Sequence, residues 1–206
     1  MNELIPLIAT RFLVMVVAFT IHELAHAVVA DRLGDPTPRR MGRLTLNPVA
    51  HLHPIGSLML LLVGFGWAKP VLVNPLNLRG DRHAAMALVA AAGPLSNVAL
   101  ALLAVLPLRL VAPGSAAGAF LAEFVFINLA LAFFNIIPIP PLDGFKVLLG
   151  GLPPRAAEQL QPLEQFGFIL VIAVVYGVPG FTSMLVVRPA LALLALLSGR
   201  PELGWA

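Results

Sequence analysis

The chain has 206 residues, of which 59% are hydrophobic and 11% are charged, whereas a soluble domain has about 45–50% apolar and about 25% charged residues. These proportions exclude a soluble enzyme and predict an all-α polytopic membrane protein, with room for about five or six spans. The net charge of +3 fits basic residues in short loops that set membrane orientation, so we expect the lipid bilayer, and no nucleic acid, as a partner.

Hydrophobic runs separated by proline and glycine clusters predict the order of the membrane segments. The first run lacks a basic leading segment and a small-residue cleavage site, so we expect a retained helix and not a signal peptide. One run is too short to cross the bilayer, which predicts a re-entrant or interfacial segment at 55–67. We expect one domain over 1–206, with core motifs at about 15–150 and C-terminal helices at about 160–198. The runs lie at about 4–30, 55–67, 84–112, 118–139, 164–178 and 181–198.

Two loop stretches resemble each other, GRLTLNP at 42–48 and KPVLVNP at 69–75. Both are rich in leucine or β-branched residues and end in Asn-Pro, which is typical of a short strand stopped by a turn. They either pair into a small membrane-associated β element or form two unrelated extended loops.

The first hydrophobic run contains HELAH at 22–26, which matches the pattern H-E-x-x-H. On a helix, His22 and His26 lie on one face and can hold a single metal ion. Glu23 can take a proton from an attacking water. The alternative, polar residues that only hold helices together, is disfavoured because an ionisable group at membrane depth is costly and marks a functional site by default. A catalytic zinc site needs a third protein ligand.

Candidates for the third ligand are the other histidines and two acids. Glu123 lies near the start of the run at 118–139, and Asp143 lies just after it, in NIIPIPPLDGFKVL. Prolines break the helix before Asp143, and irregular backbone at membrane depth is tolerated where it lines a cavity. On spacing alone, Asp143 is equally well a ligand or the N-cap of the next helix. Less favoured are the histidines in loops beside prolines and basic residues, His51, His53 and His83.

Together, HELAH and the downstream NIIPIPPLDG resemble the site-2 proteases, which are intramembrane zinc metalloproteases. The resemblance covers about 15–150 and includes AAGPLSNVAL at 91–100, GRLTLNP and GWAKPV. It implies one Zn²⁺ per chain held by His22, His26 and Asp143, with Glu23 as the catalytic acid and base. It also implies a transmembrane segment of another protein as substrate, cut by a zinc metalloendopeptidase in regulated intramembrane proteolysis. Many relatives carry a PDZ domain or a CBS pair, for which this chain has no segment long or polar enough.

If the three ligands meet at one depth, the helices at 4–30 and 118–139 run in the same direction and the helix at 84–112 runs back between them. This predicts a core of three transmembrane helices. The loops at 31–54 and 68–83 then share the face of Asp143 and carry most of the basic residues. By the positive-inside rule that face is cytoplasmic, so we expect a multi-pass protein of a prokaryotic cell membrane with its active site nearer the cytoplasm.

The tetrahedral oxyanion of peptide hydrolysis needs a donor besides zinc. Asn97, Asn128 and Asn135 are candidates, with interhelical hydrogen bonding as their alternative role. Two other classes of function remain as alternatives. A zinc or ion transporter also places histidine and aspartate at membrane depth, but the two related halves typical of transporters are not visible. A non-catalytic membrane scaffold of the same fold would not need all four catalytic positions. A homo-oligomer is left open.

Overall fold

The structure is a computed structural model that describes residues 4–56 and 68–204. In this part of the chain, four helical stretches are long and apolar enough to cross a membrane, at 8–32, 82–110, 116–135 and 154–177. A shorter apolar helix covers 183–198. The predicted all-α polytopic architecture is therefore confirmed. The predicted re-entrant segment at 55–67 lies outside the described residues except for its first two positions.

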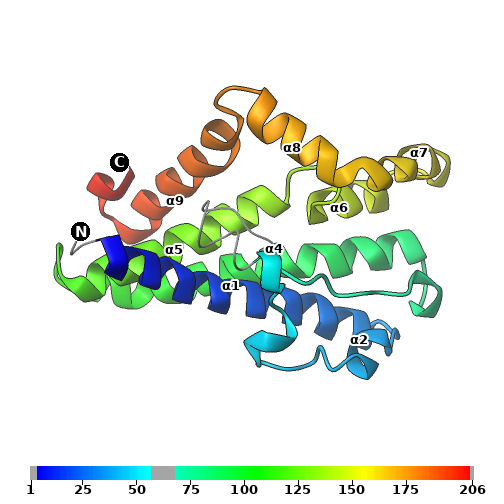
Figure 1. The fold of residues 1–206 in the computed structure, drawn as a ribbon, viewed down its shortest axis with the longest axis horizontal. Coiled ribbons are helices and arrows are strands. Elements are labelled where there is room, and N and C mark those ends of the chain that lie inside the picture. The colour runs from blue at the N-terminus through cyan, green and yellow to red at the C-terminus, as the bar shows by residue number, and fades with distance from the viewer. Residues whose placement is uncertain (1–3, 57–67, 205–206) are drawn as a thin grey trace.

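Three long helices form the core of the molecule: α1 (Leu4–Arg32), α4 (Arg82–Leu110) and α5 (Ala116–Asn135). α1 and α5 run in the same direction, and α4 runs against both (Figure 1). Two of them begin at side-chain caps, since Asp81 accepts a hydrogen bond from the Ala84 amide and Ser115 accepts one from the Gly118 amide. Such caps satisfy amide groups that have no partner within the helix.

The other elements surround this core. α8 (Gly167–Gly177) and α9 (Arg188–Ser198) form a bent pair along one side of the three helices, and both chain ends lie at the same end of the molecule (Figure 1). α9 closes the main apolar cluster against α4 and α5, with Ala190 and Leu194 buried there. The shorter elements are α2 (Thr37–Arg40), η1 (Pro48–Ala50), η2 (Pro75–Asn77), α6 (Asp143–Gly151), α7 (Pro154–Leu160), η3 (Gln161–Phe166), η4 (Ser183–Val187) and η5 (Pro201–Gly204).

The predicted β element does not form in the described residues, where pairing is limited to one antiparallel bridge between Leu52 and Ala68. Both Asn-Pro sequences instead start 3₁₀ turns, because the side chains of Asn47 and Asn74 accept hydrogen bonds from the amides two residues later. Proline also removes an amide donor that a sheet would need. These stretches are therefore extended loops.

Residues 69–77, here called the strap, are tied at both ends by buried charged side chains. Arg43 is 2% exposed and donates to the carbonyls of Lys69 at 2.9 Å and Pro70 at 2.7 Å. At the other end, fully buried Asp35 accepts from the Asn74 amide at 2.7 Å and from Asn77 Nδ2 at 2.8 Å. Burial raises the pKa of Asp35, but these hydrogen bonds and those from Thr37 outweigh it and hold the pKa below its usual value. The strap is thus fixed in place beside α1.

Candidate metal centre

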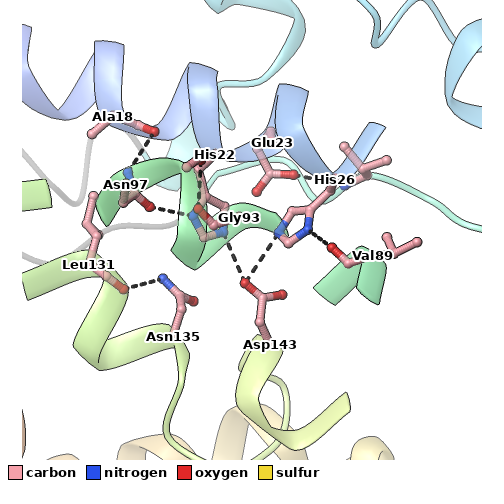
Figure 2. A network of polar contacts seen from close by, with 12 residues as sticks. Ala18, His22, Glu23, His26, Val89, Gly93, Asn97, Leu131, Asn135 and Asp143 are labelled. Carbon is pink, nitrogen blue, oxygen red and sulfur yellow. Dashed lines mark hydrogen bonds and ion pairs between the residues drawn. The ribbon is translucent and has the colours of Figure 1, made fainter. Parts of the chain in front are cut away.

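The two histidines of α1 converge on one carboxylate of α6. His22 Nε2 lies 3.1 Å from Asp143 Oδ2, and His26 Nε2 lies 3.3 Å from the same oxygen (Figure 2). The histidines are 5% and 7% exposed. Residues on successive turns of one helix and a residue more than a hundred positions later therefore meet at one buried point.

The spacing of these atoms fits zinc. The ligand atoms of His22, His26 and Asp143 all lie within 4.8 Å of one another. A tetrahedral ion with bonds of about 2.0 Å places its ligand atoms about 3.3 Å apart, close to the two separations measured here. Two imidazoles and a carboxylate are a donor set of catalytic zinc sites, which keep a fourth position open. The residues present therefore fit the metal.

Each histidine is oriented through its second ring nitrogen. His26 Nδ1 lies 2.7 Å from the Val89 carbonyl oxygen, which can only accept, so Nδ1 carries the proton. His22 Nδ1 lies 2.6 Å from Asn97 Oδ1 (Figure 2). Such contacts leave both Nε2 lone pairs free for a metal and fix the rings in place.

α4 approaches the two imidazoles at a glycine. A Cβ built on Gly93 would lie 2.5 Å from His22 Nε2 and closer still to His26 Nε2. Contacts this short are not found for real Cβ atoms, so every residue larger than glycine would press on both nitrogens. The close crossing of α1 and α4 at the metal centre therefore depends on Gly93.

Asp143 is the first residue of α6 and does not act as its cap. The N-cap position is Leu142, which makes no side-chain cap, while the Asp143 carboxylate faces the histidines. Gly144 follows because a Cβ there would run into the Ile136 carbonyl and lie 2.6 Å from the Ile137 carbonyl oxygen. The glycine is needed for close approach of two backbone segments, which holds the start of α6 beneath the site.

Glu23 lies beside the two histidines and is 8% exposed (Figure 2). Its Oε2 accepts a hydrogen bond of 3.1 Å from the backbone amide of Val71 in the strap. Because Arg43 holds the carbonyl of Pro70, the residue before Val71, the strap presents this amide to the carboxylate. Glu23 is thus adjacent to the metal group without belonging to it.

The other candidates for the third ligand lie elsewhere. Glu123 forms an ion pair of 2.6 Å with Arg11, between α5 and α1. His51 is fully buried, and its Nε2 lies 2.8 Å from the Thr45 carbonyl oxygen. Within the described residues, the one group that could hold a metal contains none of His51, His53, His83 and Glu123.

The three candidate oxyanion donors occupy different places. Asn97 and Asn128 are fully buried behind His22, and Asn97 Nδ2 donates to Asn128 Oδ1 at 2.9 Å and to the Ala18 carbonyl at 3.3 Å. Asn135 lies at the end of α5 and lines a cavity next to the metal group (Figure 2). One hydrogen of Asn135 Nδ2 is donated to the Leu131 carbonyl at 3.0 Å, which leaves its second hydrogen unassigned.

The cavity has a volume of about 610 Å³ and reaches the metal group from the side of α8 and η4. It combines His22, His26, Asp143 and Glu23 with apolar side chains from α1, α4, the strap, α5, α8 and η4. Apolar pockets with a few convergent polar groups are typical of substrate sites. The lining includes Met15, Phe19, Val71, Met86, Phe126, Phe134, Asn135, Lys146, Val171, Val175 and Val186.

Comparison with known proteins agrees with this geometry. Residues 107–175 match peptidase family M50. "Putative zinc metalloprotease YwhC" of Bacillus subtilis is 39% identical over 178 residues, which cover 81% of this chain and 81% of that protein. The chain belongs to peptidase family M50. Two further relatives are also described as putative zinc metalloproteases. Rip2 of Mycobacterium tuberculosis is 34% identical over 81% of this chain and 68% of the Rip2 chain. MJ0611 of Methanocaldococcus jannaschii is 36% identical over 63% of this chain and 64% of the MJ0611 chain.

The M50 assignment makes this protein a membrane metalloprotease of the site-2 type, with zinc as its cofactor. The matched family region includes Asp143 but not HELAH, so the association of the two motifs in one centre comes from the structure. No solved structure gives a significant match.

Sequence reasoning missed two residues of this M50 site. Arg43 is one of the basic residues of the loop at 31–54, and nothing in its local sequence indicates that it holds the strap. Gly93 was noted only as part of the resemblance. A glycine inside a long apolar helix costs about 1 kcal/mol relative to alanine and often has a packing reason, which is the signal that could have identified it.

Proposed function

We propose that this protein is a zinc endopeptidase that hydrolyses a peptide bond within or near a transmembrane segment of another membrane protein. His22, His26 and Asp143 hold the zinc, and Glu23 is the catalytic acid and base. The observation that carries the proposal is the convergence of the two Nε2 atoms on Asp143 Oδ2, at 3.1 and 3.3 Å, next to Glu23 and an apolar cavity.

The chemistry supplied by zinc at this position is polarisation of the scissile carbonyl and acidification of water. Glu23 accepts the proton of the attacking water and later donates it to the leaving amine. Its Oε2 accepts a hydrogen bond of 3.1 Å from the Val71 amide, which orients the carboxylate. Because Glu23 is next to a ligand on the same helix, its distance from the reaction is set by α1 itself.

Asn135 is the donor that we assign to the oxyanion. It lines the cavity, and its Nδ2 has a second hydrogen besides the one donated to Leu131. Asn97 and Asn128 are completely buried and are not among the residues that line the cavity. We therefore assign those two a role in positioning.

The apolar lining of the cavity supports an apolar, membrane-embedded substrate. In a helical substrate the backbone carbonyls are occupied, so a short stretch must unwind before attack. The strap offers extended backbone beside Glu23, and Leu72 in its middle is exposed. An unwound substrate strand pairs with it as an added strand.

The site lies nearer the cytoplasm in this proposal, because most arginines and lysines lie on the loops at the Asp143 end of the core helices. Exposed Arg40 and Arg79 lie on those loops, and exposed Pro113 lies in the turn between α4 and α5 at the opposite end. The chain has no native cysteine, so single cysteines report accessibility directly. Cysteines at 40 and 79 should react from the cytoplasmic side and one at 113 from the other side. The opposite labelling would place the site nearer the outer face.

The test of function compares Glu23→Gln with Glu123→Gln, the same chemical change at a carboxylate paired with Arg11. Both proteins should purify with one zinc per chain. Glu23→Gln should abolish cleavage of co-expressed membrane proteins and retain uncleaved partners that mass spectrometry identifies. Glu123→Gln should cleave. Cleavage by Glu23→Gln at the parent rate would refute the catalytic assignment, and zinc transport into vesicles without any cleavage would support an ion transporter instead.

A further inference from the structure

We propose that Asn128, a residue of α5 whose hydrogen bonds go to Phe124 and Asn97, sets the tautomer of His22 through the amide of Asn97. The proposal rests on the zinc function above, since the tautomer determines whether His22 Nε2 can bind a metal. It gives α5 a positioning residue in the metal centre in addition to its packing role.

The contacts, here called the relay, form an unbroken chain of hydrogen bonds from the Phe124 carbonyl to His22. Asn128 Nδ2 donates to the Phe124 carbonyl, one turn earlier in α5, at 2.9 Å. Asn97 Nδ2 donates to Asn128 Oδ1 at 2.9 Å, and Asn97 Oδ1 lies 2.6 Å from His22 Nδ1. Asn97 and Asn128 are fully buried and His22 is 5% exposed, so water does not compete for these groups.

The direction of every bond in this chain follows from its far end. A carbonyl oxygen only accepts, so the group of Asn128 that faces Phe124 must be its NH₂, and its oxygen then faces Asn97. That oxygen requires the NH₂ of Asn97, which turns the Asn97 oxygen toward His22. His22 Nδ1 must therefore carry a proton, and Nε2, which lies 3.1 Å from Asp143 Oδ2, is the nitrogen left for the metal.

Reversing any amide in the chain would leave a buried polar group without a partner. With Asn97 reversed, its NH₂ would face His22 Nδ1 and favour the proton on Nε2, which blocks the metal position. The longer bond of Asn97 Nδ2 to the Ala18 carbonyl, 3.3 Å, supports the same orientation, but the bond to Asn128 is the shorter of the two. His26 needs no such relay, because the Val89 carbonyl contacts its Nδ1 directly.

The relay makes a specific prediction for a double-mutant cycle. Asn128→Leu keeps the number and branching of the side-chain heavy atoms but removes the oxygen that orients Asn97. Zinc affinity measured by chelator competition should therefore fall about 10-fold, the size of effect expected for residues that orient metal ligands. Asn97→Asp presents an acceptor to His22 whichever way it turns. In the Asn97→Asp background, adding Asn128→Leu should therefore change the affinity less than about 2-fold.

A matched control and a direct readout separate the relay from loss of packing. Thr20 is 4% exposed and bonds back to its own helix at the Val16 carbonyl, as Asn128 does to Phe124. Thr20→Val should leave zinc affinity unchanged. In the zinc-free parent, ¹⁵N spectra should show a proton on His22 Nδ1, and Asn128→Leu should add a second population in which Nδ1 carries no proton.

Equal losses of zinc affinity from Asn128→Leu in both backgrounds, or an unchanged His22 tautomer, would overturn the relay. A parent protein that binds no zinc would instead overturn the proposed function, and the relay with it. If the parent binds zinc and Asn128→Leu binds it with the same affinity, the protease proposal stands and the relay alone is rejected.

Discussion

Gly93→Ala adds a single methyl group at the point where α4 crosses the metal centre. The added Cβ would lie 2.5 Å from His22 Nε2, 2.6 Å from His22 Cε1 and closer still to His26 Nε2. An ordinary carbon–nitrogen contact is about 3.5 Å, so the imidazoles or the helices must move by about 1 Å. Rotation of the rings would break the Nδ1 contacts of His22 and His26 at 2.6 and 2.7 Å.

A shift of this size is larger than a zinc site tolerates, since ligand distances hold within about 0.2 Å. We therefore expect Gly93→Ala to lower zinc affinity at least about 100-fold and to abolish proteolysis. The helix itself should not suffer, because alanine is favoured over glycine in a helix by about 1 kcal/mol. The loss should therefore be of metal and not of fold.

The assay measures zinc content and zinc affinity by chelator competition in detergent, with thermal unfolding of the zinc-free protein alongside. Gly151→Ala is the matched control, because a Cβ at this α6 position meets nothing within 4 Å. It should bind zinc as the parent does. If Gly93→Ala binds zinc with parental stoichiometry and affinity, the close approach of α4 to the histidines is not what shapes the site.

Three further predictions concern the surroundings of the metal. Asp143→Asn should lower zinc affinity at least about 10-fold. Glu123→Gln should keep zinc and lower only the thermal stability, because Glu123 loses its ion pair with Arg11. If metal analysis shows the reverse pattern, Glu123 is the ligand. Arg43→Met should retain zinc but lower kcat and the unfolding temperature, because the carbonyls at the start of the strap lose their donor. Arg43→Lys should not restore kcat, since one ammonium cannot replace the guanidinium fork; full activity in either variant would show that the strap does not position the base. Gly144→Ala should displace the start of α6 and reduce zinc content, measured against Gly151→Ala.

The sequence by itself determined the class of protein and half of the candidate metal centre. A strongly apolar composition has no explanation in a soluble domain, and helical periodicity alone brings His22 and His26 to one face. Neither inference needs contacts between segments that are distant in sequence. Composition is a property of the whole chain, and the face of a helix is set by residues that are neighbours in both sequence and space. The helix directions also followed, once the resemblance linked HELAH to Asp143.

Tertiary structure decided what depends on crossings between distant segments. Sequence spacing does not distinguish whether Asp143 caps the next helix or binds a metal. Only the approach of α6 to α1 directs its carboxylate to the histidines. The hydrogen bonds of Arg43 to the strap and the relay from Phe124 to His22 likewise join segments that are far apart in sequence. The predicted β element does not form in the described residues for the converse reason. Strand-like composition is a local property, but a sheet needs a partner edge. Here the Asn caps and the Arg43 side chain bond to the backbone groups instead, and the prolines remove amide donors.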